Sequence, residues 1–374
     1  MSTNWYSALR LGLLLSVVLA LSGGPLSAQT DQETKRSTAK RLLNEGRQLR
    51  DEGSRESLAA AITKFAEARP LFHSLNDVLN EAFVVLAIGR TYGDLDEYEK
   101  DLDYSTQALS LYRAAGERKL EAIVINNIAT VHFRLGDRQK ALDYIGQALT
   151  ISRALGDRRN EALTVDNMGA IYEALGDLQR ALECHSQALA IYQAIADRDG
   201  EANSLNNIGL IYADRGEKQK ALDYYSRALP ILREIRSRDG EAVTILNIGS
   251  AYSDLGEQQK ALDHYVQALE LFRIVGDRKY EASALNNIGK VYHEVGEDLK
   301  ALDYLAQALS IKQSIGDRAG EADLLNNMGA IYDALNQPQK AIDFYQQALP
   351  LRRAVGDRQG EATTLGNLGM VYRA

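Results

Sequence analysis

The sequence predicts an all-α fold, a solenoid of stacked antiparallel helix pairs. The first observation is a 40-residue period in which a glutamate opens each copy, at Glu81, Glu121, Glu161, Glu201, Glu241, Glu281, Glu321 and Glu361. The second is that both halves of a copy carry apolar residues at helical spacing, and the third is a glycine-containing break between the halves. A fixed period of this length is typical of solenoids, whose units stack because none can bury its apolar face alone.

Composition bounds the class of protein. The 374 residues are 45% hydrophobic and 25% charged, which is ordinary for a folded soluble chain. The net charge of −8 speaks against a nucleic-acid partner, which would favour a basic face. The single cysteine, Cys184, excludes an internal disulfide framework and a cysteine-rich zinc site.

Residues 1–28 have the order of a secretory signal peptide. One charged residue, Arg10, precedes a largely apolar run over 11–21 and a small-residue exit that ends at Ala28. The run is shorter than the ~18 residues expected of a spanning helix. We therefore expect cleavage after Ala28, export to the periplasm or the medium, and no stable membrane insertion of the mature chain. The alternative is a chain tethered to the membrane by an uncleaved N-terminus.

After a linker over 29–37, residues 38–77 are predicted to form a divergent first repeat. Gly46 and Phe65 stand at the places that Gly209 and Tyr225 occupy in a regular copy, if the connecting loop is slightly longer. Terminal repeats of solenoids are commonly atypical because one of their faces meets water. We interpret this segment as the N-terminal cap.

Residues 78–374 are predicted to form seven 40-residue repeats and the first helix of an eighth. The copy over 201–240 illustrates the pattern, with apolar or small residues at i, i+3, i+4 and i+7 in its first half and a similar set in its second half. Two helices of about 14 and 18 residues are expected in each copy. At the junction Gly276-Asp277-Arg278 the glycine can end one helix and the aspartate can cap the next. Gly209 is expected to leave room for an opposing side chain.

The motif LNNIG…Y…G…KALDYY…AL resembles the tetratricopeptide repeat, over roughly residues 38–374. Its 40-residue variety is most similar to kinesin light chains, to the Leu-Gly-Asn cell-polarity adaptors and to bacterial proteins whose repeats precede a caspase-like CHAT domain. The resemblance implies a right-handed superhelical array whose first helices line a concave face. It also implies that asparagine amides on this face bind the main chain of an extended peptide.

An asparagine recurs near the middle of the first helices. Set at 100° per residue, Asn207 lies about 200° from Leu205 and so opposite the core. An amide can pair with both N–H and C=O of a peptide whatever its side chains. The alternatives are persistence through repeat duplication and hydrogen bonds to a neighbouring helix. The predicted peptide-binding amides are Asn44, Asn127, Asn167, Asn207, Asn247, Asn287 and Asn327, together with Asn206, Asn286 and Asn326.

A shorter acidic row follows on the same face. Asp214, Asp254 and Glu294 occupy one position in three successive repeats, near the end of the first helix. Negative charge there opposes the helix dipole, a small cost without a local gain. Either a partner that carries basic residues or a solvated acidic edge accounts for the row.

No catalytic or phosphate-binding motif occurs in the sequence, and the histidines fall at unrelated positions of different repeats. We therefore predict a non-enzyme without catalytic residues, metal or cofactor, a scaffold that binds a protein or an extended peptide. Because the last copy contains only a first helix, the alternative is the sensor arm of a larger CHAT-type peptidase that continues past Ala374. A purely structural spacer is a third reading.

Overall fold

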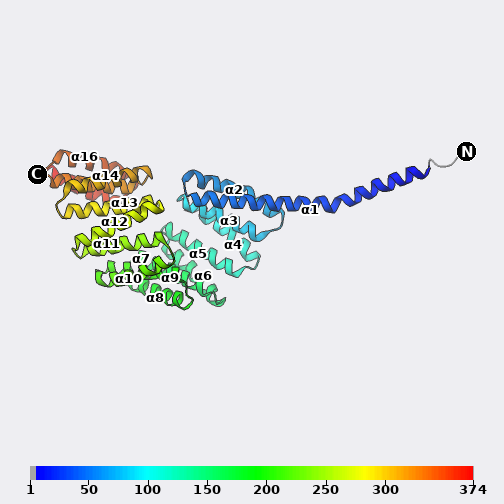
Figure 1. Ribbon diagram of the computed structural model, residues 1–374, viewed down its shortest axis with the longest axis horizontal. Coiled ribbons are helices and arrows are strands. Elements are labelled where there is room, and N and C mark those ends of the chain that lie inside the picture. The colour runs from blue at the N-terminus through cyan, green and yellow to red at the C-terminus, as the bar shows by residue number, and fades with distance from the viewer. Residues whose placement is uncertain (1–5, 374) are drawn as a thin grey trace. The chain divides into compact units, whose positions relative to one another are not determined.

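The computed structural model describes residues 6–373, with side chains from residue 29 onward, and this part of the chain is helical throughout. Figure 1 shows the helices as successive antiparallel hairpins. Their bounds are α1 Tyr6–Glu52, α2 Arg55–Ser74, α3 Val78–Asp94, α4 Tyr98–Ala114, α5 Arg118–Arg134, α6 Arg138–Ala154, α7 Arg158–Ala174, α8 Leu178–Ala194, α9 Arg198–Asp214, α10 Lys218–Glu234, α11 Arg238–Asp254, α12 Gln258–Val275, α13 Arg278–Glu294, α14 Asp298–Ser314, α15 Arg318–Ala334, α16 Pro338–Ala354 and α17 Arg358–Val371. The predicted all-α array of helix pairs is confirmed.

The two helices of a regular repeat are equal in length, 17 residues each in α9 and α10, rather than about 14 and 18. The first helix is longer than expected because the junction aspartate caps it early. Asp197 accepts a hydrogen bond from the backbone N–H of Gly200 at 3.2 Å, so the helix begins before the glutamate that opens the copy. We call the first helix of each repeat the A-helix and the second the B-helix.

The junction between repeats has the predicted geometry. Gly276 lies in the left-handed region at φ 79°, which glycine reaches without a Cβ penalty. The carboxylate of Asp277 accepts a hydrogen bond from the backbone N–H of Tyr280 at 3.0 Å and caps the following helix. The predicted glycine stop and aspartate cap are confirmed at this junction.

The chain divides into two compact units, residues 1–176 and residues 177–374. The first unit contains the pairs α1/α2, α3/α4 and α5/α6 and the single helix α7. The second contains α8, the pairs α9/α10, α11/α12, α13/α14 and α15/α16, and α17. The division falls inside one sequence repeat, between its A-helix and its B-helix.

Helix α1 is longer than any other helix. Its N-terminal part projects away from the helices against which its C-terminal part packs (Figure 1). Residues 29–37, predicted as a linker, form part of this helix. Of the predicted signal peptide, residues 1–5 and the side chains of 6–28 lie outside the described part. Within the described residues, no helix is long and apolar enough to span a membrane.

Small residues set the distance between paired helices. A Cβ on Gly209 would lie 2.4 Å from the ring of Tyr225, and one on Gly46 would lie 2.5 Å from the ring of Phe65. Real Cβ atoms do not approach other heavy atoms this closely, so both positions require glycine for the rings to fit. The same contact therefore forms in the divergent first repeat and in the regular copies.

The glutamate that opens each copy binds the preceding B-helix to its own A-helix. Glu121 is buried and accepts hydrogen bonds from Arg113 of α4 at 2.8 Å and from Arg118 of α5 at 2.6 Å. Burial raises the pKa of Glu121, but the hydrogen bonds and the positive charges of Arg113 and Arg118 together lower it by more, so that the net pKa lies below its ordinary value. This contact recurs around Glu161 and Glu281 and accounts for the arginine at the repeat junction.

Candidate functional site

The candidate site is the surface of the A-helices that faces away from their own B-helices, called here the A-face. In α9 this surface exposes Asn203, Leu210 and Asp214, as the helical periodicity predicts. Leu205 and Ile208, on the opposite side of the helix, are buried among apolar neighbours. The residues available to a partner on this helix are therefore separate from those that hold the fold.

The asparagines predicted to line the A-face lie deeper than the helical wheel indicates. Asn207, Asn247, Asn287 and Asn327 are half-buried, whereas Asn44 in α1 is exposed. A wheel treats one helix in isolation, but successive A-helices also contact each other along this side, α9 with α11 and α11 with α13. The amides are therefore at the edge of a helix–helix contact as well as at the surface.

Neighbouring A-helices are joined by a series of amide hydrogen bonds, which we call the asparagine ladder. In each rung the side-chain N–H of one asparagine donates to the side-chain oxygen of an asparagine 41 residues earlier, in the preceding A-helix. The rungs are Asn167 to Asn126 at 3.3 Å in the first unit, and Asn247 to Asn206 at 3.3 Å, Asn327 to Asn286 at 3.3 Å and Asn367 to Asn326 at 3.2 Å in the second.

The ladder accounts for the first asparagine of each Asn-Asn doublet, which is the acceptor for the next repeat. Of the four donors, only Asn327 is itself the second asparagine of a doublet. Of the hydrogen-bonded acceptors, Asn206, Asn286 and Asn326 are among the predicted site residues, whereas Asn126 is a residue that sequence reasoning does not single out, although the doublet Asn126-Asn127 signals it. Four asparagines therefore hydrogen-bond a neighbouring helix, which is one of the alternatives that the sequence left open.

Two asparagines lack a rung because an apolar residue stands where the acceptor belongs. The acceptor position 41 residues before Asn127 is occupied by Leu86, and that before Asn287 is occupied by Leu246. Among the described residues, the side-chain nitrogen of Asn127 is shielded from water and has no hydrogen-bond partner. Such a group carries a desolvation cost until it finds an acceptor.

The rungs leave part of each amide available. An asparagine amide has two N–H donors and an oxygen with two lone pairs, and a rung uses one donor of the later residue. The remaining N–H and the oxygen of Asn247 and of Asn327 form no other hydrogen bond with a described residue, and both side chains are half-buried. Such a group could hold both the N–H and the C=O of a peptide segment laid across the helices.

The acidic residues of the A-face are largely engaged by the chain itself. Asp254 forms an ion pair with Lys218, and Glu294 accepts a hydrogen bond from Gln258 at 2.7 Å. Lys218 and Gln258 both lie at the start of the B-helix of the preceding repeat. The equivalent position for Asp214 is occupied by Leu178, which cannot pair with a carboxylate. The contacts of Asp254 and Glu294 therefore provide a local stabilisation that the sequence pattern did not show.

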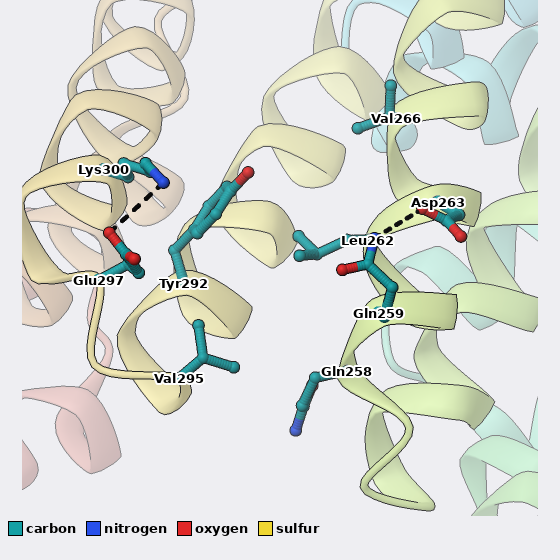
Figure 2. A pocket seen from close by; sticks show the side chains of 9 residues that line it. All are labelled: Gln258, Gln259, Leu262, Asp263, Val266, Tyr292, Val295, Glu297 and Lys300. Atoms are coloured by element: carbon teal, nitrogen blue, oxygen red, sulfur yellow. Dashed lines mark hydrogen bonds and ion pairs between the residues drawn. The ribbon is translucent and has the colours of Figure 1, made fainter.

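A pocket lies between α12, the end of α13 and the start of α14. It has a volume of about 640 Å³, and Leu262 and Tyr292 point into it from opposite walls (Figure 2). Two of its polar residues are already paired with neighbours, Lys300 with Glu297 at 3.4 Å and Gln259 with Asp263 at 2.9 Å. The A-face is the better candidate for an extended partner because its amides keep free hydrogen-bonding capacity in several successive repeats.

Within the described residues, no cluster of three or more His, Cys, Asp or Glu side chains is arranged to hold a metal ion. The predicted peptide contacts of the asparagines and of the acidic row stay predictions. The structure shows that some of these amides also form hydrogen bonds that join neighbouring A-helices.

Comparison with protein families identifies the repeat. The tetratricopeptide repeat model matches overlapping segments that together span 81–374. The segments are 81–154, 120–194, 158–234, 201–274, 241–314, 280–354 and 320–374. No curated protein matches the chain.

Solved structures share the fold at low sequence identity. A Signal Transduction ATPase with Numerous Domains (STAND) protein with a tetratricopeptide repeat sensor, from Pyrococcus horikoshii, has a TM-score of 0.63 and 17% identity over 89% of this chain. This chain spans about half, 49%, of the length of that protein.

Two similar structures are matched over nearly their whole length. The apo form of the quorum sensor NprR from B. thuringiensis has a TM-score of 0.62 and 16% identity over 91% of this chain and 97% of its own. A Rap protein complexed with Competence and Sporulation Factor has a TM-score of 0.56 and 14% identity, over 91% and 98%. At these identities the likeness is one of fold.

Proposed function

Because the chain belongs to the tetratricopeptide repeat family, we propose that it is a non-catalytic scaffold that binds a protein segment or an extended peptide along its A-face. The asparagine amides contact the main chain of the partner, and the side chains exposed beside them, such as Asn203 and Leu210, contact its side chains. No cofactor takes part in this function.

The observation that carries the proposal is the hydrogen bonding of the asparagine amides. Asn247 and Asn327 are half-buried and each is fixed by one hydrogen bond to the preceding A-helix, at 3.3 Å, while the second N–H and the oxygen of each amide bond no other described residue. A group held in place loses less side-chain entropy when it binds a ligand than a free one does. The ladder thus supports binding by orienting the amides, besides joining the helices.

The similar structures support a sensing or recognition role. NprR is a quorum sensor, and the Rap protein was solved in complex with Competence and Sporulation Factor. We infer for this chain the same general role, recognition of a partner by an array of helical repeats.

The test is selection of ligands from a random peptide library, followed by affinity measurement with a triple variant. In the variant Asn207, Asn247 and Asn287 are all replaced by alanine. Each lost main-chain bond is worth about 0.5–1.5 kcal/mol net, so three should weaken binding by about tenfold to a thousandfold. Since Asn247 also forms a rung, the folded fraction is measured by circular dichroism.

A matched control removes three amides from the B-helices. Gln267, Gln307 and Gln347 are exposed and occupy equivalent positions in successive repeats. Their replacement by alanine should leave peptide affinity unchanged. Equal loss of affinity in the two triple variants would contradict binding on the A-face.

A second candidate function is the sensor arm of a larger signalling protein. The similarity to the repeat sensor of a multidomain ATPase, of which this chain spans about half the length, supports it. Reading the gene beyond the codon of Ala374 tests this candidate, and an immediate stop codon would remove it.

We propose in addition that the protein is exported after cleavage of residues 1–28. The support is the charged, apolar and small-residue order of this segment. N-terminal sequencing of the protein from its native cell tests it. A mature chain that starts at Gln29 would support export, and one that retains Met1 would contradict cleavage.

A further inference from the structure

The pocket between α12, the end of α13 and the start of α14 forms a groove along the B-helix α12 of the second unit, called here the α12 groove. Its volume of about 640 Å³ lies within the range of ~300–1,000 Å³ that ligand sites occupy. The residues of α12 that line it run from Gln258 to Val266, which is about 12 Å along the helix axis at ~1.5 Å per residue. The groove is therefore about two helical turns long.

Apolar side chains face each other across the groove. Figure 2 shows Leu262 and Val266 on the α12 wall, opposite Tyr292 of α13. Val266 is 41% exposed, and Val295, at the turn between α13 and α14, is 48% exposed. A partner that covers these side chains would remove apolar surface from water, which favours binding.

Val266 is not required by the repeat fold. No other repeat has a branched aliphatic side chain at this position. The equivalent residues are Thr106, Gly146, Ser186, Ser226, Ala306 and Gln346. The valine wall is therefore particular to this groove.

Three donors of the groove are engaged by neighbouring carboxylates. They are Gln258 with Glu294 at 2.7 Å, Gln259 with Asp263 at 2.9 Å, and Lys300 with Glu297 at 3.4 Å. An extended peptide that left water here would find few replacements for the hydrogen bonds of its main chain. An α-helix satisfies its own main chain and needs only contacts to its side chains. The groove therefore suits a helical partner.

The charge of the groove is negative. Lys300 and Glu297 compensate each other, but Asp263 is bonded only by the neutral amide of Gln259 and forms no ion pair with any described residue. A carboxylate beside apolar walls favours a partner with a basic residue. A second copy of this chain, with a net charge of −8, would bring charge of the same sign.

We propose that the α12 groove is a second docking surface, which binds an amphipathic helix of a partner protein. The helix presents aliphatic side chains at i, i+4 and i+7, which lie between Val266 and Tyr292. A lysine or arginine beside this stripe pairs with Asp263. The surface is separate from the A-face and does not depend on the function proposed for it.

The experiment uses the full chain and measures affinity by fluorescence anisotropy. The probe is a fluorescein-labelled, alanine-based helix of about 15 residues that carries leucines at i, i+4 and i+7 and lysines beside them. One counterpart has glutamates in place of the lysines, and another has a central proline that breaks the helix. We expect the helical lysine probe to bind about tenfold more tightly than either counterpart.

Two variants test the walls of the groove. Val266→Ser introduces the residue that two other repeats have at this position and should weaken the probe about threefold to tenfold. Asp263→Asn should weaken it about threefold and reduce the salt dependence of binding. Leu299→Gln is the matched control, because Leu299 is 79% exposed on α14 but does not line the groove. It should leave the affinity unchanged.

Equal loss of affinity in Val266→Ser and Leu299→Gln would overturn the docking surface. Equal binding of the helical and the proline-containing probes, or no binding of the helical probe at about 1 mM, would overturn it as well.

These failures are distinct from failure of the proposed function. Short peptides are not stably helical in water, so the library selection reports extended ligands of the A-face. The alanine variant of Asn207, Asn247 and Asn287 should bind the helical probe as the wild type does. Loss of the probe in that variant would place it on the A-face and refute the α12 groove.

Discussion

The loss of folding stability on removal of one rung of the asparagine ladder can be calculated from the structure. Asn327→Ala deletes the hydrogen bond from the Asn327 amide in α15 to the oxygen of Asn286 in α13. A side-chain hydrogen bond contributes about 0.5–1.5 kcal/mol net. At 3.3 Å the bond is longer than the usual ~2.9–3.0 Å, so we expect the lower part of this range, about 0.5–1 kcal/mol.

Asn287→Ala is the matched control. Asn287 has the same place in its own A-helix and is also half-buried, but Leu246 stands where its acceptor would be. Alanine is a better helix former than asparagine by about 0.5 kcal/mol, and this gain is common to both variants. It cancels in the comparison, so Asn327→Ala should be less stable than Asn287→Ala by the energy of the rung.

The assay combines urea denaturation with amide hydrogen exchange. Repeat arrays unfold as nearly one-dimensional chains of neighbours, so local exchange in α13 and α15 reports the contact more directly than a global midpoint does. In an Asn286→Leu background, which copies the natural residue at 246, Asn327→Ala should carry no such cost. Equal stability of Asn327→Ala and Asn287→Ala, or an unchanged cost in that background, would refute the ladder as a structural contact.

Gly209→Ala should destabilise the fold by about 1–3 kcal/mol, because its Cβ would lie 2.4 Å from the ring of Tyr225. Gly146→Ala in α6 should stabilise it by up to ~1 kcal/mol, since its Cβ would meet nothing within 4 Å, and a reversed order in thermal melting would contradict the packing. Glu121→Gln should cost about 1–3 kcal/mol by leaving its arginines without the carboxylate, and urea unfolding at pH 7 measures this. Because the net pKa of Glu121 is lowered in the fold, its contribution is present above the ordinary value of 4.5 and is lost as pH falls through the folded-state pKa. A difference between wild type and Glu121→Gln that stays constant down to pH 3 would contradict this assignment.

The repeat period, the helix pairs and the junction caps could be read from the sequence because each depends on residues close together in the chain. Asp277 and Gly276 act on helix ends within a few residues, and Gly209 faces a tyrosine only 16 positions away. What the sequence could not show was how successive A-helices contact each other. The wheel placed Asn207 on a free surface, whereas Asn247 in the next repeat reaches 41 residues back to a partner asparagine.

The sequence predicted only part of the candidate site, because it does not show how successive A-helices contact each other. The doublet Asn206-Asn207 showed that amides recur, but only the packing of successive A-helices shows that Asn206 accepts a hydrogen bond from Asn247 of the next repeat. Asn127 looked like one more member of the row until the apolar neighbour Leu86 left its amide unpaired.

The claim that a partner lies along the A-face is tested most directly by photo-crosslinking. A benzophenone amino acid is placed at Leu210, exposed on α9, and in a second variant at Val266, exposed on the B-helix α12. Each variant is irradiated with the tightest peptide from the library selection, and the crosslinked fraction is measured by mass spectrometry. The account predicts efficient crosslinking from position 210 and background levels from position 266. Crosslinking mainly from position 266 would contradict it.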